Sequence, residues 1–244
     1  MTIREYMIFI GLLLVCALFS GYASRKVHTA FAAFSSVENS ARLTGYDAAK
    51  RLLRNNGVTD ISVNRIKGNL TDHYHPTKKV VNLSESVYGN DSIASVAVAA
   101  HEIGHVMQKK KGYFPYKIRA ALGPVANFGS RIALPLVIVG VLLDVLLANA
   151  TAEYGFWVAM IGVALYGAST LFMLVTLPVE FNASKRAKQM LLEEGILADE
   201  EIDGADKVLS AAALTYVASL ATSLVYFLRF LIWVLAMFGK RDRD

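Results

Sequence analysis

Four stretches of this chain are apolar over the length that an α-helix needs to cross a lipid bilayer. The first lies within residues 1–24 and includes 18 successive uncharged positions, close to the lower limit of roughly 17 residues for a span. Residues 132–177 are predicted to form a hairpin of two membrane helices, because polar and turn-forming residues interrupt the apolar run near its middle. A fourth membrane helix is predicted over 209–239, followed by a charged tail at 240–244.

The first apolar stretch also fits a cleaved signal peptide. Small residues at Gly21 and Ala23 would suit a cut after Ala23. A signal peptide has a net positive charge before its apolar part, whereas Glu5 cancels Arg4 in this chain. A membrane helix is therefore the stronger of the two interpretations.

The polar segments 25–131 and 178–208 carry the signals of a small folded domain. A Thr-x-x-Asp cap at Thr44 and a glycine stop at Gly57 indicate a short amphipathic helix. Asp72–Pro76 is expected to be a turn. The other predicted elements are strands over 61–63 and 79–84 and a helix that starts after Asp91 or Ser92 and ends at Gly112. The predicted fold class is α+β, a small domain joined to about four membrane helices that make the chain mostly helical.

Composition and charge agree with a membrane protein and suggest its orientation. Hydrophobic residues make up 55% of the 244 positions and charged residues 18%, and the mean hydropathy is +0.41. Residues 25–131 hold 16 Lys and Arg, whereas the turn near 153 holds none. Since basic loops stay in the cytoplasm, this segment is placed there and both termini outside. The single cysteine, Cys16, excludes an intramolecular disulfide. The basic segment carries no nucleic-acid-binding motif, so its charge is assigned to topology and anionic lipids.

The predicted helix that ends at Gly112 carries the sequence His101-Glu102-Ile103-Gly104-His105. Residues four apart on a helix face the same way, so the two imidazoles can bind one Zn²⁺. Glu102 is rotated by one residue, which lets its carboxylate reach a water molecule at the metal. Two imidazoles and a carboxylate among Ala, Val and Ile are costly to bury without partners, and a metal would supply them.

This helix can also be interpreted as an intramembrane active-site helix over residues 92–107. Sixteen residues are short for a span, and Lys109, Lys110 and Lys111 follow directly. A helix in a cytoplasmic domain near the membrane surface is the preferred interpretation.

A catalytic zinc site needs a third protein ligand and one open position. The imidazoles outside the motif are His28, His73 and His75, and several carboxylates are also available. Glu180 is the strongest candidate, since Pro178 suits the first turn of a helix at this point. An acid there is also what the first turn of any helix favours.

Three segments together resemble the YugP-type membrane zinc metallopeptidases of bacteria. They are HEIGHVMQ, LPVEFNASKRA and VLSAAALTYVASL, and their order and spacing match along nearly the whole chain. The resemblance implies a zincin-like domain of the gluzincin kind, with His101, His105 and Glu180 as ligands of one Zn²⁺ per chain and Glu102 as the catalytic acid and base. HtpX-type membrane proteases are similar in plan. His75 and Asn182 stand where the family usually has Asp.

Two further features have candidate roles in catalysis. His73 or Tyr74 could stabilise an oxyanion on the substrate carbonyl, or could be solvated turn residues or an ancillary metal site. By resemblance to zincins, Val80–Leu83 is the candidate edge strand that pairs with an extended substrate, and a purely structural strand is the alternative.

The sequence therefore predicts a zinc endopeptidase of the bacterial inner membrane, with its catalytic domain in the cytoplasm. Its expected partners are a protein or peptide substrate near the membrane and the lipid bilayer, with no nucleic acid. A zinc-stabilised scaffold or regulator that cleaves nothing and an intramembrane metalloprotease are the alternatives. The substrate and the oligomeric state do not follow from the sequence.

Overall fold

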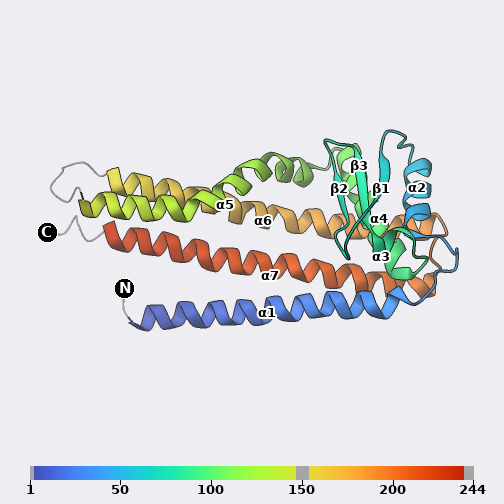
Figure 1. The fold of residues 1–244 in the computed structure, drawn as a ribbon, viewed down its shortest axis with the longest axis horizontal. Coiled ribbons are helices and arrows are strands. Elements are labelled where there is room, and N and C mark those ends of the chain that lie inside the picture. The colour runs from blue at the N-terminus through green and yellow to red at the C-terminus, as the bar shows by residue number, and fades with distance from the viewer. Residues whose placement is uncertain (1–2, 147–153, 239–244) are drawn as a thin grey trace. The chain divides into compact units, whose positions relative to one another are not determined.

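The computed structural model describes residues 3–146 and 154–238, a mostly helical chain with one small sheet (Figure 1). The turn expected near 153 and the tail at 240–244 lie outside these residues. The elements are α1 (Ile3–Ser35), α2 (Gly45–Asn55), β1 (Ser62–Ile66), β2 (His73–His75), β3 (Val80–Ser84), α3 (Glu85–Tyr88), α4 (Ile93–Lys110), α5 (Phe114–Leu146), α6 (Tyr154–Glu193) and α7 (Asp199–Phe238).

Four of these helices, α1, α5, α6 and α7, are long and apolar enough to cross a membrane. This confirms the four apolar helices predicted from the sequence. Among the described residues α4, which the intramembrane interpretation placed in the bilayer, is not one of them. Two of these helices, α6 and α7, have 40 residues each and extend well beyond the predicted apolar stretches.

The prediction that a helix begins at Pro178 is wrong, because Pro178 lies inside α6. A proline in a helix lacks one backbone donor, and the neighbouring turns of a long helix hold the chain helical across that point. The third apolar stretch and Glu180 therefore belong to one continuous helix.

The chain divides into two compact units. The apolar unit comprises Met1–Gly21, Ile118–Thr176 and Tyr216–Asp244, and the polar unit comprises Tyr22–Lys117 and Leu177–Thr215. The predicted polar domain extends to residue 131, whereas α5 already starts at Phe114 and is part of the apolar unit from Ile118.

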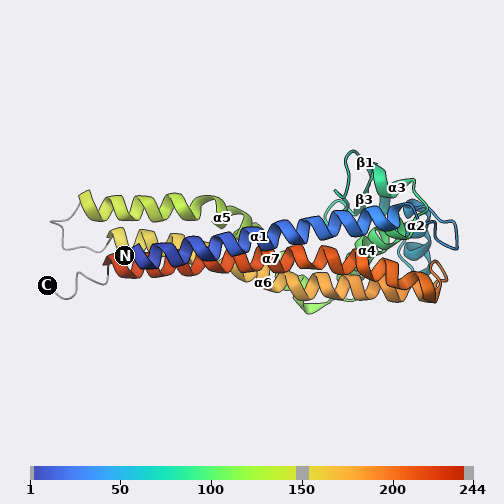
Figure 2. The ribbon, with the colours of Figure 1, turned by 90° about the horizontal axis from the view of Figure 1, so that it is seen from below.

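Small residues bring α5 and α6 together in the apolar unit, where the two helices run side by side (Figures 1 and 2). A Cβ atom on Gly162 would lie 2.7 Å from the carbonyl oxygen of Ala133, and one on Gly140 would lie 2.5 Å from the backbone nitrogen of Ala159. Ser169 Oγ also donates to the carbonyl of Ala126 at 2.9 Å. Close backbone approach at small residues is the usual packing mode of membrane helices.

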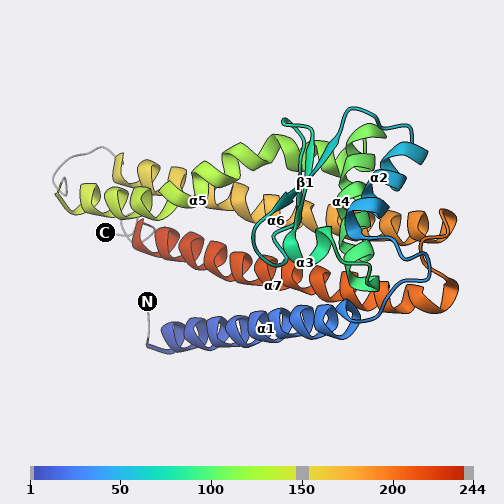
Figure 3. The same cartoon turned by 45° about the vertical axis from the view of Figure 1, so that its right-hand side comes forward.

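The polar unit is built on a three-stranded sheet in the order β1-β3-β2, with α2 and α4 packed beside it (Figure 3). β1 pairs with β3 in parallel and β2 pairs with β3 in antiparallel fashion. The buried core of this unit includes apolar residues of both helices and the sheet; among them are Leu52, Val81, Leu83, Val96 and Ile103.

The helix caps of the polar unit agree with the sequence analysis. Thr44 and Asp47 form the predicted capping box at the start of α2, and Ser92 caps α4. Gly112 follows α4 with φ +63°, a left-handed conformation that glycine adopts without strain. The two predicted strands occur as β1 and β3, with boundaries shifted by a few residues.

Two predictions about the sheet are wrong. Residues 73–75 form β2 and not a turn, since they pair with β3, and Asp72 accepts hydrogen bonds from Ser84 N at 2.7 Å and Ser84 Oγ at 2.8 Å. Val80–Leu83 is not an edge strand, because β3 lies between β1 and β2. Its backbone groups are used on both sides, so a substrate strand cannot pair with it.

Candidate metal centre

α4 and α6 bring two imidazoles and one carboxylate of the polar unit to the same point. His101 Nε2 lies 3.1 Å from Glu180 Oε2, and His105 Nε2 lies 3.5 Å from the same oxygen. The three ligand atoms all lie within 4.8 Å of one another. Glu180 and His105 are buried, and His101 is partly exposed.

These distances fit a tetrahedral zinc ion. Zinc binds imidazole nitrogen and carboxylate oxygen at ~2.0–2.2 Å, so two donors at the tetrahedral angle are separated by about 3.3 Å. The two nitrogen-to-oxygen distances, 3.1 and 3.5 Å, bracket that value. Two imidazoles with one carboxylate are also a donor set that zinc takes in catalytic sites. The residues present therefore fit the metal.

The second nitrogen of each imidazole has its own polar partner. His101 Nδ1 lies 3.1 Å from Ser184 Oγ, and His105 Nδ1 lies 3.0 Å from Gln108 Oε1. An amide oxygen can only accept, so Nδ1 of His105 carries the proton and donates it. This leaves the lone pair of Nε2 directed at the metal position, the arrangement that outer partners of zinc-binding histidines impose.

Gln108 connects His105 to α6. Its side chain is fully buried, and its Nε2 donates to the carbonyl of Val179 at 2.7 Å and to Asn182 Oδ1 at 3.1 Å. Val179 directly precedes Glu180. One side chain therefore fixes the orientation of one ligand and the position of the helix that carries another.

Gly104 allows the two helices to come close enough for the three ligands to meet. A Cβ atom at this position would lie only 2.6 Å from the carbonyl oxygen of Ala183. Backbone atoms of α6 cannot move away as a flexible side chain could. A larger residue between His101 and His105 would therefore push α6, with Glu180, away from the imidazoles.

Glu102 is 7% exposed, and burial raises the pKa of its carboxyl to about 7. The nearby His101 lowers the pKa of Glu102, whereas the negative charge of Glu180 raises it further. The backbone of Tyr74 also acts to lower the pKa of this carboxyl. A carboxyl with this pKa can take up and release a proton near neutral pH, as a general base requires.

The pKa of Glu180 is lowered, in contrast to that of Glu102. Burial favours its neutral form, but the adjacent imidazoles of His101 and His105 outweigh burial and hold the pKa of Glu180 below its ordinary value. It is therefore an ionised carboxylate, the form that binds a metal.

Comparison with known proteins identifies the family of this chain. Residues 7–235 match the family described as "Putative neutral zinc metallopeptidase". The chain belongs to this family. It is also 43% identical over 238 residues to "Putative membrane protease YugP" of Bacillus subtilis (strain 168), covering 98% of this chain and 100% of that one. No solved structure matches the chain.

The family match confirms the resemblance noted in the sequence. Together with the four apolar helices, the similarity to a protein described as a membrane protease indicates that this metallopeptidase-family chain is a membrane protein. Zinc is the metal that the family description names.

The remaining histidines lie apart from the group of three. His73 uses both ring nitrogens elsewhere, Nδ1 with the carbonyl of Thr71 at 2.9 Å and Nε2 with the Asn82 amide at 3.0 Å. His75 Nδ1 accepts from the backbone N–H of Lys78 at 3.3 Å, and His28 is exposed on α1. Within the described residues, the group of possible metal ligands contains none of these imidazoles.

Tyr74, the other candidate for stabilising an oxyanion, lies in β2, which packs against α4, the helix that carries Glu102. Asn182 Oδ1 accepts from Gln108 Nε2 at 3.1 Å and from Arg186 Nε at 2.8 Å.

Ser184 was not recognised from the sequence. It lies four residues after Glu180 on α6, so both side chains project from the same face of the helix. That spacing is the signal that could have identified it as the partner of His101.

Proposed function

We propose that this protein is a membrane-embedded zinc-dependent endopeptidase. One Zn²⁺ per chain is held by His101, His105 and Glu180, and Glu102 is the catalytic acid and base. The observation that carries the proposal is the convergence of the three ligand atoms within 4.8 Å, next to a buried glutamate whose pKa is about 7. A site that only stabilises the fold has no need of such a base.

The chemistry follows from the residues. When bound, zinc acts as a Lewis acid that polarises the substrate carbonyl and lowers the pKa of water. Glu102 accepts a proton from the attacking water on its carboxylate and then donates it to the amine that leaves. Ser184 and Gln108 keep the two imidazoles in the orientation that metal binding needs.

The polar unit is proposed to act as a zincin-like domain, with β2 as the strand that guides the substrate. β2 is at an edge of the sheet and packs against α4, the helix that carries Glu102. An extended peptide beside β2 would therefore pass the catalytic carboxylate.

The proposed location is the bacterial inner membrane, with several membrane crossings and the catalytic domain in the cytoplasm. The support is the 16 Lys and Arg of residues 25–131 and their absence from the turn near 153. The proposed substrate is a protein or peptide close to the membrane.

Two substitutions test this function in the purified, zinc-loaded full chain. Glu102→Gln should keep the metal and lose hydrolysis of fluorogenic peptides by at least a hundredfold. Glu180→Ala should lose the metal, as measured by elemental analysis after dialysis. Full activity of Glu102→Gln would remove Glu102 from the mechanism. If the zinc-loaded parent protein cleaves no peptide, the alternative function, a zinc-stabilised scaffold or regulator, would be favoured.

A further inference from the structure

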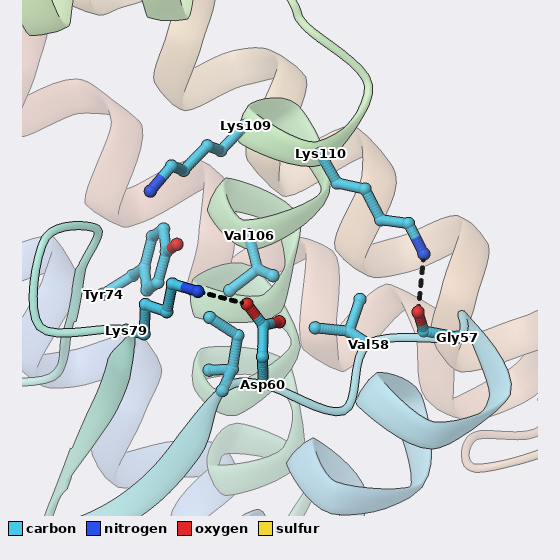
Figure 4. Close-up of a pocket in the computed structure, with 9 residues that line it drawn as sticks. Gly57, Val58, Asp60, Tyr74, Lys79, Val106, Lys109 and Lys110 are labelled. Carbon is cyan, nitrogen blue, oxygen red and sulfur yellow. Dashed lines mark hydrogen bonds and ion pairs between the residues drawn. The ribbon is translucent and has the colours of Figure 1, made fainter.

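A pocket of about 380 Å³ lies between the C-terminal half of α4 and the sheet, all within the polar unit (Figure 4). Apolar side chains from Val58, Ile61 and Val106 form part of its lining. The remaining lining residues are Gly57, Asp60, Tyr74, Lys79, Lys109 and Lys110. The volume is in the range of ordinary ligand sites.

The pocket carries an excess of fixed positive charge. Its single acid, Asp60, pairs with Lys79 at 2.8 Å. Lys109 Nζ donates to the carbonyl of Pro76 at 2.7 Å, and Lys110 Nζ donates to the carbonyl of Gly57 at 2.8 Å. These carbonyls hold the ammonium groups in place but carry no charge that would neutralise them. Three lysines and one aspartate leave a net charge of +2.

The phenol of Tyr74 does not offset this charge. Burial raises its pKa to about 12, so the ring stays neutral across the physiological range. Among the described residues no carboxylate is shown in an ion pair with Lys109 or Lys110. An anion is therefore the group that the pocket would accept best, and a cationic side chain would be repelled.

The nearest lining residue of the pocket on α4, Val106, is about one helical turn from the proposed catalytic carboxylate. Val106 and Lys109 follow Glu102 on α4 by four and seven residues, which corresponds to about 6 and 10 Å along the helix axis. Tyr74 connects the pocket to α4, because β2 packs against this helix and the Tyr74 side chain lines the pocket. An extended peptide rises ~3.3 Å per residue. A peptide whose cleaved bond lies at Glu102 would therefore reach Lys109 about three residues further along.

We propose that this pocket binds a carboxylate of the peptide substrate two or three residues from the bond that is cleaved. The carboxylate comes either from an Asp or Glu side chain or from the C-terminus of the substrate. The inference rests on the proposed peptidase function and adds a substrate class to it, peptides with a negative charge at a fixed distance from the cleavage site.

Matched fluorogenic peptides test the proposal on the zinc-loaded full chain. One series has an amidated C-terminus and a single Glu that moves along a neutral sequence, and each member has a Gln counterpart. Another peptide has no Glu and a free C-terminal carboxylate. For one position of Glu, kcat/KM should exceed that of the Gln peptide about tenfold, the usual effect of a hydrogen bond to a charged group. A preference for the free C-terminus alone would identify that source of the carboxylate.

Lys109→Met should reduce the ratio of kcat/KM for the Glu peptide to kcat/KM for the Gln peptide to near one. Lys111→Met is the matched control, because it removes the same charge two residues away and Lys111 does not line the pocket. The preference should survive in the control. An equal rate for Glu and Gln peptides at every position, with no preference for the free C-terminus, would overturn the proposal. So would a preference that Lys109→Met leaves unchanged.

Binding separates this inference from the peptidase proposal. Fluorescence anisotropy of the same peptides with the Glu102→Gln variant needs no turnover. The parent protein could cleave nothing while the charged peptides bind about tenfold tighter than the neutral ones and lose this advantage in Lys109→Met. In that case the pocket proposal is supported and the peptidase proposal fails. If charged and neutral peptides bind equally, the pocket proposal fails.

Discussion

The side-chain amide of Gln108 donates a 2.7 Å hydrogen bond to the backbone carbonyl of Val179, the residue before Glu180. The oxygen of the same amide accepts from His105. Two of the three proposed zinc ligands are thus positioned by one buried side chain that lies outside the His-Glu-x-x-His sequence.

Gln108→Leu should lower the affinity for zinc by about 10- to 100-fold, the usual effect of losing an outer partner of a metal ligand. Leucine is similar in size but can neither accept from His105 nor donate to Val179. Competition with a chromophoric chelator measures the change. Gln189→Leu is the control, since Gln189 is exposed on α6. Equal zinc affinities in the two variants would show that Gln108 does not position the ligand.

Ser184→Ala should also weaken zinc binding, by about tenfold. The substitution removes the hydroxyl that lies 3.1 Å from His101 Nδ1 and leaves the helix propensity of α6 intact or improved. The same chelator competition applies. Ser184→Asp should bind zinc at least as well as the parent, because a carboxylate is a stronger acceptor for the imidazole proton. Weaker binding in the Asp variant than in the Ala variant would contradict this role.

Gly104→Ala should destabilise the polar unit and reduce zinc binding together. The added methyl would lie 2.6 Å from the carbonyl oxygen of Ala183, and overpacking of this kind costs about 1–3 kcal/mol. The expected result is a lower thermal unfolding midpoint in detergent and a lower zinc content. Gly89→Ala is the matched control, because a Cβ atom there meets nothing within 4 Å. An unchanged midpoint in Gly104→Ala would argue against close contact of α4 and α6.

The stability of the metal-free protein should depend on pH through Glu102. Its pKa rises from 4.5 to about 7 on folding, chiefly because of burial. A raised pKa means that the stabilising contribution is complete below pH 4.5 and is lost as the pH increases through 7. The Glu102→Gln variant has no carboxyl to ionise at this position, so its stability does not fall in this way. At pH 8 its free energy of unfolding should exceed that of the parent protein by on the order of 3 kcal/mol.

Thermal unfolding with a chelator present, from pH 5 to pH 8, measures this difference. The midpoints of the parent and of Glu102→Gln should be similar at pH 5 and separate as the pH rises. Curves that stay parallel over the whole range would show that burial does not shift this carboxyl.

Local sequence signals predicted the helix that carries the two imidazoles. Ser92 and Gly112 mark its ends, and the four-residue spacing of His101 and His105 follows from the helical repeat. The caps depend only on neighbouring residues, so they can be read without knowledge of the rest of the fold.

Features that depend on distant residues could not be predicted in this way. Pro76 indicates the turn in which it lies, whereas the pairing of β2 with β3 is fixed by contacts across the sheet that no local pattern reveals. The continuation of α6 through Pro178 was missed because a proline usually marks a helix start. Glu180 was only one of several possible third ligands until the resemblance to a family was considered.

The ligands are spaced so that the metal centre can be completed only late in biosynthesis. His101 and His105 leave the ribosome 75 or more residues before Glu180, and the third apolar stretch must be translated between them. A nascent chain that ends before α6 holds two ligands and cannot form the three-ligand site. The order of synthesis therefore keeps the proposed metal centre incomplete until most of the protein has been made.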